Sequence, residues 1–168
     1  EGLKCICQGL MDDVSLKYLD LSWNFISGQG MQYILEMLKE NKSLRKLYIQ
    51  HNNLEELGAK QMVQALIIHP QMKYLDISAN QIGSQGFLYF KELFETNHTL
   101  RNLHVRKNGI GDASIRYLPL SLMNNTNMKY LDLQDNNFSN NFGDNLLEVL
   151  KNNITIEDLE IGGNNFIN

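Results

Sequence analysis

Cysteine is almost absent from this chain: only Cys5 and Cys7 occur among 168 residues. They stand two positions apart in a segment, residues 2–14, that we expect to be helical, so their side chains point in different directions. A disulfide or a metal site formed by this pair is therefore not expected, and Cys7 is predicted to be a small buried apolar group. Because no disulfide framework is present, the sequence favours a reducing, intracellular compartment, and within it the cytoplasm.

Long apolar runs and an excess of positive charge are also missing. No apolar stretch approaches the roughly 18 residues that a membrane span requires, and the formal net charge is -4. Nucleic acids and anionic membranes attract basic surfaces. Neither nucleic acid nor membrane is therefore expected as a partner.

A nine-residue motif, in contrast, recurs every 28 residues along the chain. The copies are LKYLDLSWN (16–24), LRKLYIQHN (44–52), MKYLDISAN (72–80), LRNLHVRKN (100–108), MKYLDLQDN (128–136) and IEDLEIGGN (156–164). One leucine and one asparagine stand in register in all six copies: Leu19, Leu47, Leu75, Leu103, Leu131 and Leu159; Asn24, Asn52, Asn80, Asn108, Asn136 and Asn164. A period of about 20 to 29 residues headed by L-x-x-L-x-L-x-x-N is typical of leucine-rich repeats.

Each unit is expected to contain a short strand followed by a helix. Residues 18–22 alternate polar and apolar side chains, which predicts a half-buried strand, and residues 28–41 change to helical spacing. The asparagine at the strand end is predicted to bond the backbone of the turn. Strands pack about 4.8 Å apart and helices about 8 to 10 Å apart, so the stack should bend with its strands inside. The predicted fold class is α/β, a horseshoe-shaped solenoid with parallel strands on the concave face and helices on the convex face.

The 28-residue unit resembles the ribonuclease-inhibitor-like subclass of leucine-rich repeats. The resemblance rests on the strand motif and on helices that end in an asparagine before the next x-S/T-L, as at 41–44 and 97–100. The subclass includes ribonuclease inhibitors, Ran GTPase-activating proteins, tropomodulins, innate immune receptors and ciliary dynein-regulatory subunits. The resemblance thus implies the fold and leaves several functions open.

Residues 1–168 are predicted to be a single repeat array, with both ends inside a repeat. A half repeat spans 1–14, full repeats start near 15, 43, 71, 99 and 127, and a partial repeat spans 155–168. Solenoids shield their ends with polar capping repeats, and neither cap is recognisable. We therefore expect the sequence to be a piece of a longer array, and membership of a larger complex stays open.

The outward strand positions predict an aromatic and acidic stripe on the concave face. Tyrosine, tryptophan and arginine supply much of the binding energy at protein interfaces. The predicted partner-binding residues are Tyr18, Trp23, Lys46, Tyr48, Tyr74, Asp76, His104, Arg106, Tyr130 and Asp132. The alternative is that these side chains satisfy one another as solvated cross-strand pairs.

His104 is flanked by Asp76 and Asp132 at one strand spacing on either side. Two carboxylates favour the charged imidazole, which would make His104 a pH-sensitive contact. This row of outward strand residues is open to water and has no second histidine, so no metal site is predicted. No cofactor is predicted either.

Two features interrupt the repeat pattern on the helical side. Pro119 falls well inside the fourth helical segment, so that helix should begin late or kink. Ile67 and Ile68 occupy positions that hold Lys39-Glu40, Glu95-Thr96 and Lys151-Asn152 in three other repeats. We predict a lateral contact there, although isolated exposed apolar residues often have no function.

Three functions remain open from the sequence. The first is a non-catalytic scaffold that binds a protein partner through the concave strand face. The second is a Ran-type GTPase-activating protein, which only the resemblance implies. The third is a structural subunit of a cytoskeletal or ciliary assembly. No nucleophile, base and orienting acid recur together, so no catalytic residues are predicted and the chain is not expected to be an enzyme.

Overall fold

The structure is a computed structural model that describes residues 1–167; Asn168, the last residue of the expected partial repeat, lies outside the described residues. Six strands form one parallel sheet in chain order. Their bounds are β1 Tyr18–Asp20, β2 Lys46–Tyr48, β3 Tyr74–Asp76, β4 Asn102–His104, β5 Tyr130–Asp132 and β6 Asp158–Glu160. In the pairing register Leu19 lies beside Leu47, and Leu47 beside Leu75. The predicted 28-residue period is confirmed.

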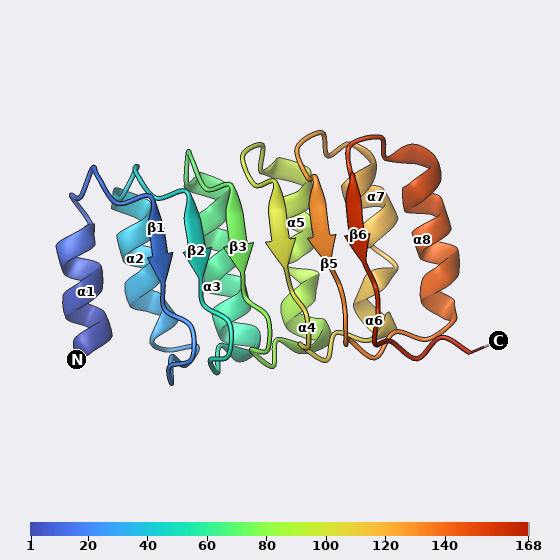
Figure 1. Cartoon of the computed structure of the whole chain (residues 1–168), viewed down its shortest axis with the longest axis horizontal. Coiled ribbons are helices and arrows are strands. Elements are labelled where there is room, and N and C mark those ends of the chain that lie inside the picture. The colour runs from blue at the N-terminus through green and yellow to red at the C-terminus, as the bar shows by residue number, and fades with distance from the viewer. Residues whose placement is uncertain (168) are drawn as a thin grey trace.

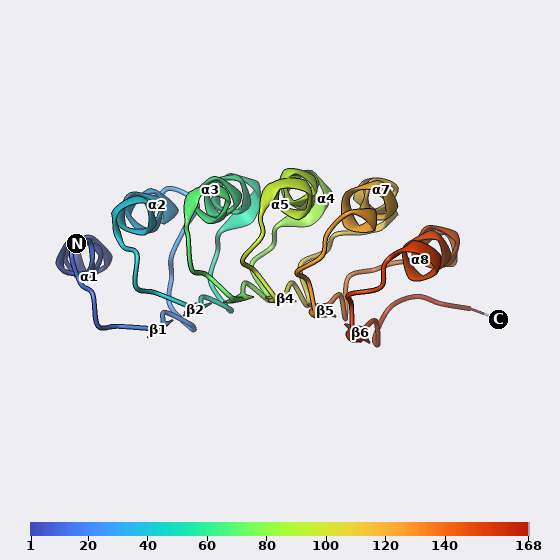
Figure 2. The same ribbon diagram turned by 90° about the horizontal axis from the view of Figure 1, so that it is seen from above.

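Helices connect the strands and lie on one side of the sheet (Figure 1). Their bounds are α1 Gly2–Leu10, α2 Met31–Glu40, α3 Glu55–Ile68, α4 Gly83–Leu88, α5 Phe90–Thr96, α6 Asp112–Ile115, α7 Leu118–Met123 and α8 Asn141–Asn152. Seen from above, both layers bend, with the helices on the outer side of a shallow arc and the strands on the inner side (Figure 2). The predicted α/β solenoid with concave strands and convex helices is confirmed. None of the helices described is long and apolar enough to cross a membrane.

The core fills the space between the two layers. Leu47, Leu75, Leu103 and Leu131 are fully buried, whereas Leu19 and Leu159 of the outermost strands are only partly covered. A central repeat is thus sealed by a neighbour on each side, as expected where repeats bury a core by stacking. Cys7 is buried in this core, which raises the pKa of its thiol to about 11.

The asparagines in register bond the backbone of their own turns, as predicted, and from Asn52 onward each also bonds the preceding repeat. The Asn108 Nδ2 donates to the carbonyls of Val105, at 2.9 Å, and of Ile77 in the preceding repeat, at 3.1 Å. Its Oδ1 accepts the backbone N–H of Asn80 at 2.8 Å. One amide therefore satisfies backbone groups in two repeats.

A second set of side chains caps the returns from helix to strand. The Asn97 Nδ2 donates to the Leu66 carbonyl at 2.7 Å, and its Oδ1 accepts the N–H groups of Thr99 and Leu100. Asn41, Asn125 and Asn153 form the same contacts in their repeats. In the second repeat this place is taken by His69.

Two helices are interrupted. Pro119 lies in the first turn of α7, separated from α6 by two residues, which confirms the predicted break because proline fits only the first turn of a helix. The interruption between α4 and α5 was not predicted. There the Tyr89 N–H donates to the Gly86 carbonyl, three residues back instead of four, so the cause is a local tightening of the helix.

Candidate functional site

A continuous row of aromatic rings crosses the concave face. Neighbouring ring centroids lie 4.8 Å apart for Tyr18 and Tyr48, 4.7 Å for Tyr48 and Tyr74, 4.9 Å for Tyr74 and His104, and 4.6 Å for His104 and Tyr130. These distances fall within the range of attractive aromatic pairs. We call these five residues the aromatic ladder.

The ladder is continuous because its members alternate between two positions on the strands. Tyr18, Tyr74 and Tyr130 occupy the first strand position, while Tyr48 and His104 occupy the third. Each ring therefore reaches its neighbour along the diagonal, which is within range of long aromatic side chains. The signal in the sequence is an alternation over two repeats, KYLD at 17–20, 73–76 and 129–132 against RKLY and RNLH between them.

Three ladder tyrosines, Tyr18, Tyr74 and Tyr130, present neutral hydroxyls. Burial raises the pKa of all three above the ordinary tyrosine value. The next cause is a nearby carboxylate for Tyr18 and Tyr130, and the neighbouring Tyr48 followed by Asp76 for Tyr74. The Lys46 ammonium lies 5.9 Å from the Tyr74 ring centroid, a cation–π distance. The face thus combines apolar ring surfaces with polar tips.

The acids beside the ladder first serve the strand ends. The Oδ1 atoms of Asp20 and Asp76 accept the N–H of the residue two places on at 2.9 Å, and Asp132 does the same at 3.0 Å. The second oxygen of Asp132 lies 3.4 Å from Nδ1 of His104. Both predicted acids flank His104 in the pairing register, but among residues 1–167 only Asp132 lies within ion-pair distance.

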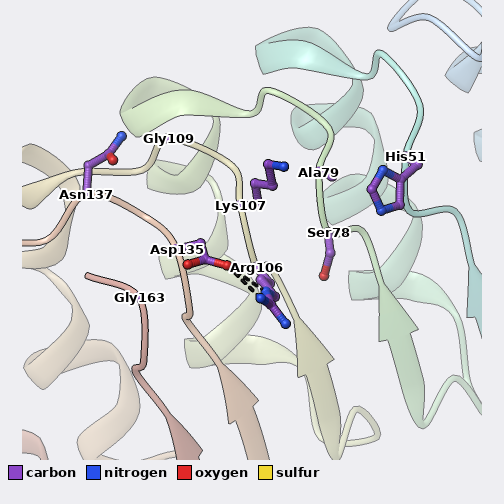
Figure 3. A pocket seen from close by; sticks show the side chains of 9 residues that line it. All are labelled: His51, Ser78, Ala79, Arg106, Lys107, Gly109, Asp135, Asn137 and Gly163. Atoms are coloured by element: carbon purple, nitrogen blue, oxygen red, sulfur yellow. Dashed lines mark hydrogen bonds and ion pairs between the residues drawn. The ribbon is translucent and has the colours of Figure 1, made fainter. Parts of the chain in front are cut away.

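At the loop edge of the same face, the residue just before each strand-end asparagine adopts the left-handed backbone conformation. These residues are Trp23, His51, Ala79, Lys107, Asp135 and Gly163, with φ between 53° and 69°. The Trp23 indole stacks on the His51 imidazole, and Trp23 is 73% exposed. A hollow opens further along this edge, where Arg106 and Asp135 pair at 2.8 Å (Figure 3).

All ten residues predicted to bind a partner are brought onto this one surface, which we call the concave face. Phe25, which is fully exposed next to Trp23 at the loop edge, was missed. Its sequence signal was available, since Asn53, Gln81 and Asn137 make the same register polar.

The predicted lateral pair lies elsewhere, at the end of α3. Ile68 is 52% exposed, whereas Ile67 packs against the core. Within residues 1–167 no three histidine, cysteine, aspartate or glutamate side chains are grouped to hold a metal ion.

An open, curved parallel sheet that alternates with helices defines an α/β solenoid. The family model for leucine-rich repeats matches residues 13–35, 40–63, 70–90, 96–118 and 124–145, so the chain belongs to the leucine-rich repeat family. Among solved structures it is similar to Leiomodin-1 Actin-Binding Site 2, with a TM-score of 0.73 and 15% identity over 86% of this chain and 83% of that chain. At this identity the likeness is one of fold. No curated protein matches the sequence.

Proposed function

We propose that the chain is a non-catalytic scaffold that binds a protein partner through its concave strand face. The observation that supports this most strongly is the aromatic ladder, five rings in mutual contact along the exposed side of the sheet. Tyrosines supply large contact areas with few rotatable bonds. Contact between the rings restricts their rotation before binding, which lowers the entropy that a partner must overcome.

A capture experiment with matched variants tests the proposal. Three proteins are immobilised and exposed to cell extract: the wild-type chain, a concave variant and a convex variant. The concave variant carries Tyr74→Ala, His104→Ala and Tyr130→Ala. The convex variant carries Tyr33→Ala, Tyr89→Ala and Tyr117→Ala. Circular dichroism and thermal melts first establish that all three are folded. The partner should be retained by the wild-type chain and the convex variant and lost from the concave variant. Equal capture by the concave variant would overturn the proposal.

Actin is a second, more specific candidate as the partner. The solved domain of similar fold is described as an actin-binding site, which agrees with the cytoskeletal role that the sequence left open. Co-sedimentation with filamentous actin and titration with monomeric actin test this directly. If neither form binds, actin is excluded and the scaffold proposal is judged on the capture experiment alone.

A further inference from the structure

The hollow at the loop edge of the concave face has a volume of about 670 Å³. It exists because the side chains along this edge differ in size. His51 and Lys107 stand on either side of Ala79 (Figure 3), and Gly163 at the far end has no side chain. The Asp135 side chain covers Gly163. Ala79 is smaller than the tryptophan, histidine, lysine and aspartate of the same register, and this leaves space beside it for a side chain from another molecule.

The charges that line the hollow do not cancel. Nε and one terminal nitrogen of Arg106 both lie 2.8 Å from the same oxygen of Asp135, so this carboxylate is already paired. Lys107 has no ion-pair partner within residues 1–167. Two cations against one carboxylate leave one positive charge uncompensated, on a protein whose formal net charge is -4.

The hollow continues from the aromatic ladder. Arg106 follows His104 by two positions, and Val105 between them is fully buried, so the two polar side chains lie on the same face of the sheet. A segment that covers His104 and Tyr130 would therefore bring its neighbouring side chains to Arg106 and Lys107.

We infer that the hollow receives an aspartate or glutamate side chain from the protein segment that occupies the ladder. This inference rests on the proposed function, because it describes how the same partner is recognised. One carboxylate matches the one uncompensated charge, and within residues 1–167 the other terminal nitrogen of Arg106 keeps N–H donors for it. A phosphate group carries about 1.5 to 2 negative charges, which would exceed that charge and repel Asp135.

Selection from a random peptide library tests the inference. Phage-displayed dodecapeptides are selected on the wild-type chain, and the recovered peptides are measured against Lys107→Gln and against Lys73→Gln. Lys73 is an exposed lysine just before strand β3, at the opposite edge of the same face, so it controls for long-range attraction.

Acidic residues should be enriched in the selected peptides, and Lys107→Gln should weaken their binding about fivefold, while Lys73→Gln leaves it unchanged. Replacing the peptide's glutamate by glutamine should cause the same loss, and replacing it by phosphoserine should not strengthen binding. No acidic enrichment, equal effects of the two lysine variants, or tighter binding of the phosphoserine peptide overturns the inference.

The concave variant, which carries Tyr74→Ala, His104→Ala and Tyr130→Ala, separates this inference from the proposed function. If the selected peptides show no acidic enrichment but lose binding to this variant, the carboxylate in the hollow is refuted and binding through the concave face is supported. Peptides that bind that variant as well as wild type refute the concave face itself, and with it the inference.

Discussion

The Trp23 indole and the His51 imidazole stack with their centroids 3.6 Å apart and their planes 10° from parallel. Both residues have positive φ, at 57° and 55°. Their backbones are held in this conformation by the next repeat, since the Trp23 N–H donates to the Gln50 carbonyl and the His51 N–H to the Ser78 carbonyl, each at 3.0 Å. The stack therefore places a large aromatic surface at the rim of the concave face.

Removing His51 should free the Trp23 ring without unfolding the chain. Trp23 is the sole tryptophan, so its fluorescence anisotropy reports on this ring alone. We expect His51→Ala to lower the anisotropy, because an exposed and unstacked ring reorients within nanoseconds. The free energy of unfolding should change by less than about 1 kcal/mol, since Ala79 shows that alanine fits this register with φ of 53°.

Phe25→Ala is the matched control for this experiment. Phe25 is exposed two residues from Trp23, and within residues 1–167 the Trp23 ring stacks on His51 and not on Phe25. Its removal should leave the anisotropy unchanged. An unchanged anisotropy in His51→Ala as well would mean that the stack is not populated in solution.

Asn108→Ala should destabilise the chain far more than Asn24→Ala. Asn108 is 2% exposed and bonds backbone groups in two repeats, so its loss leaves buried groups unsatisfied and should cost about 2 to 4 kcal/mol. Asn24 is exposed, and within residues 1–167 its side chain donates only to the Leu21 and Ser22 carbonyls of its own turn. Urea denaturation of both variants measures the difference, and equal midpoints would contradict the structural role of the asparagines in register.

The repeat architecture could be predicted from the sequence because its determinants are local and identical in every unit. A leucine such as Leu75 has to point into the core, and an asparagine such as Asn80 has to bond the turn that follows. Six copies at one spacing leave no competing register. The strand pairing of Leu19, Leu47 and Leu75 follows from this directly.

The aromatic ladder could be predicted only in part. Tyr18 occupies the first position of its strand and Tyr48 the third, so comparing equivalent positions between repeats does not reveal that their rings touch on the diagonal. The left-handed backbone conformation along the loop edge could not be predicted either, because alanine and lysine, which occupy it at Ala79 and Lys107, have no preference for positive φ. Backbone bonds between adjacent loops, such as Ala79 N–H to the Arg106 carbonyl at 2.8 Å, impose it.

Gly86 and Gly30 occupy the same register but should respond differently to alanine. A Cβ at Gly86 would lie 2.5 Å from Cγ2 of Ile82 and 3.2 Å from Cα of Glu56, so α3 and α4 would have to separate. The nearest atom to a Cβ at Gly30 is 3.4 Å away. We expect Gly86→Ala to lower the free energy of unfolding by about 1 to 3 kcal/mol and Gly30→Ala by less than about 1. Equal thermal shifts would contradict the close approach.

His69 should make the stability of the chain depend on pH. Its Nδ1 accepts the N–H groups of Gln71 and Met72 at 3.3 and 3.1 Å, where other repeats use an asparagine oxygen. Burial, and then the positive charge of Lys42, lowers the pKa of His69 to about 4, against the weaker opposing effect of the Asn41 carbonyl. Protonation would also remove the lone pair that accepts both bonds.

The direction of the pH effect follows from comparing the two states. The unfolded imidazole binds its proton near pH 6.5, whereas the folded one remains neutral down to about pH 4. Between these values the unfolded chain holds the extra proton, so stability contributed by His69 is complete above about pH 7 and declines as the pH falls toward 4. The total loss should be at most roughly 3 kcal/mol.

His69→Asn isolates this contribution, because asparagine occupies the same place at Asn41 and Asn97 and supplies an acceptor that does not titrate in this range. Urea denaturation at pH 7, 6, 5 and 4.5 should show a smaller decline in the free energy of unfolding for His69→Asn than for wild type. His98→Asn is the control. His98 is exposed just after helix α5, so its removal should leave the decline unchanged. Parallel curves for wild type and His69→Asn would show that burial does not lower the pKa of His69.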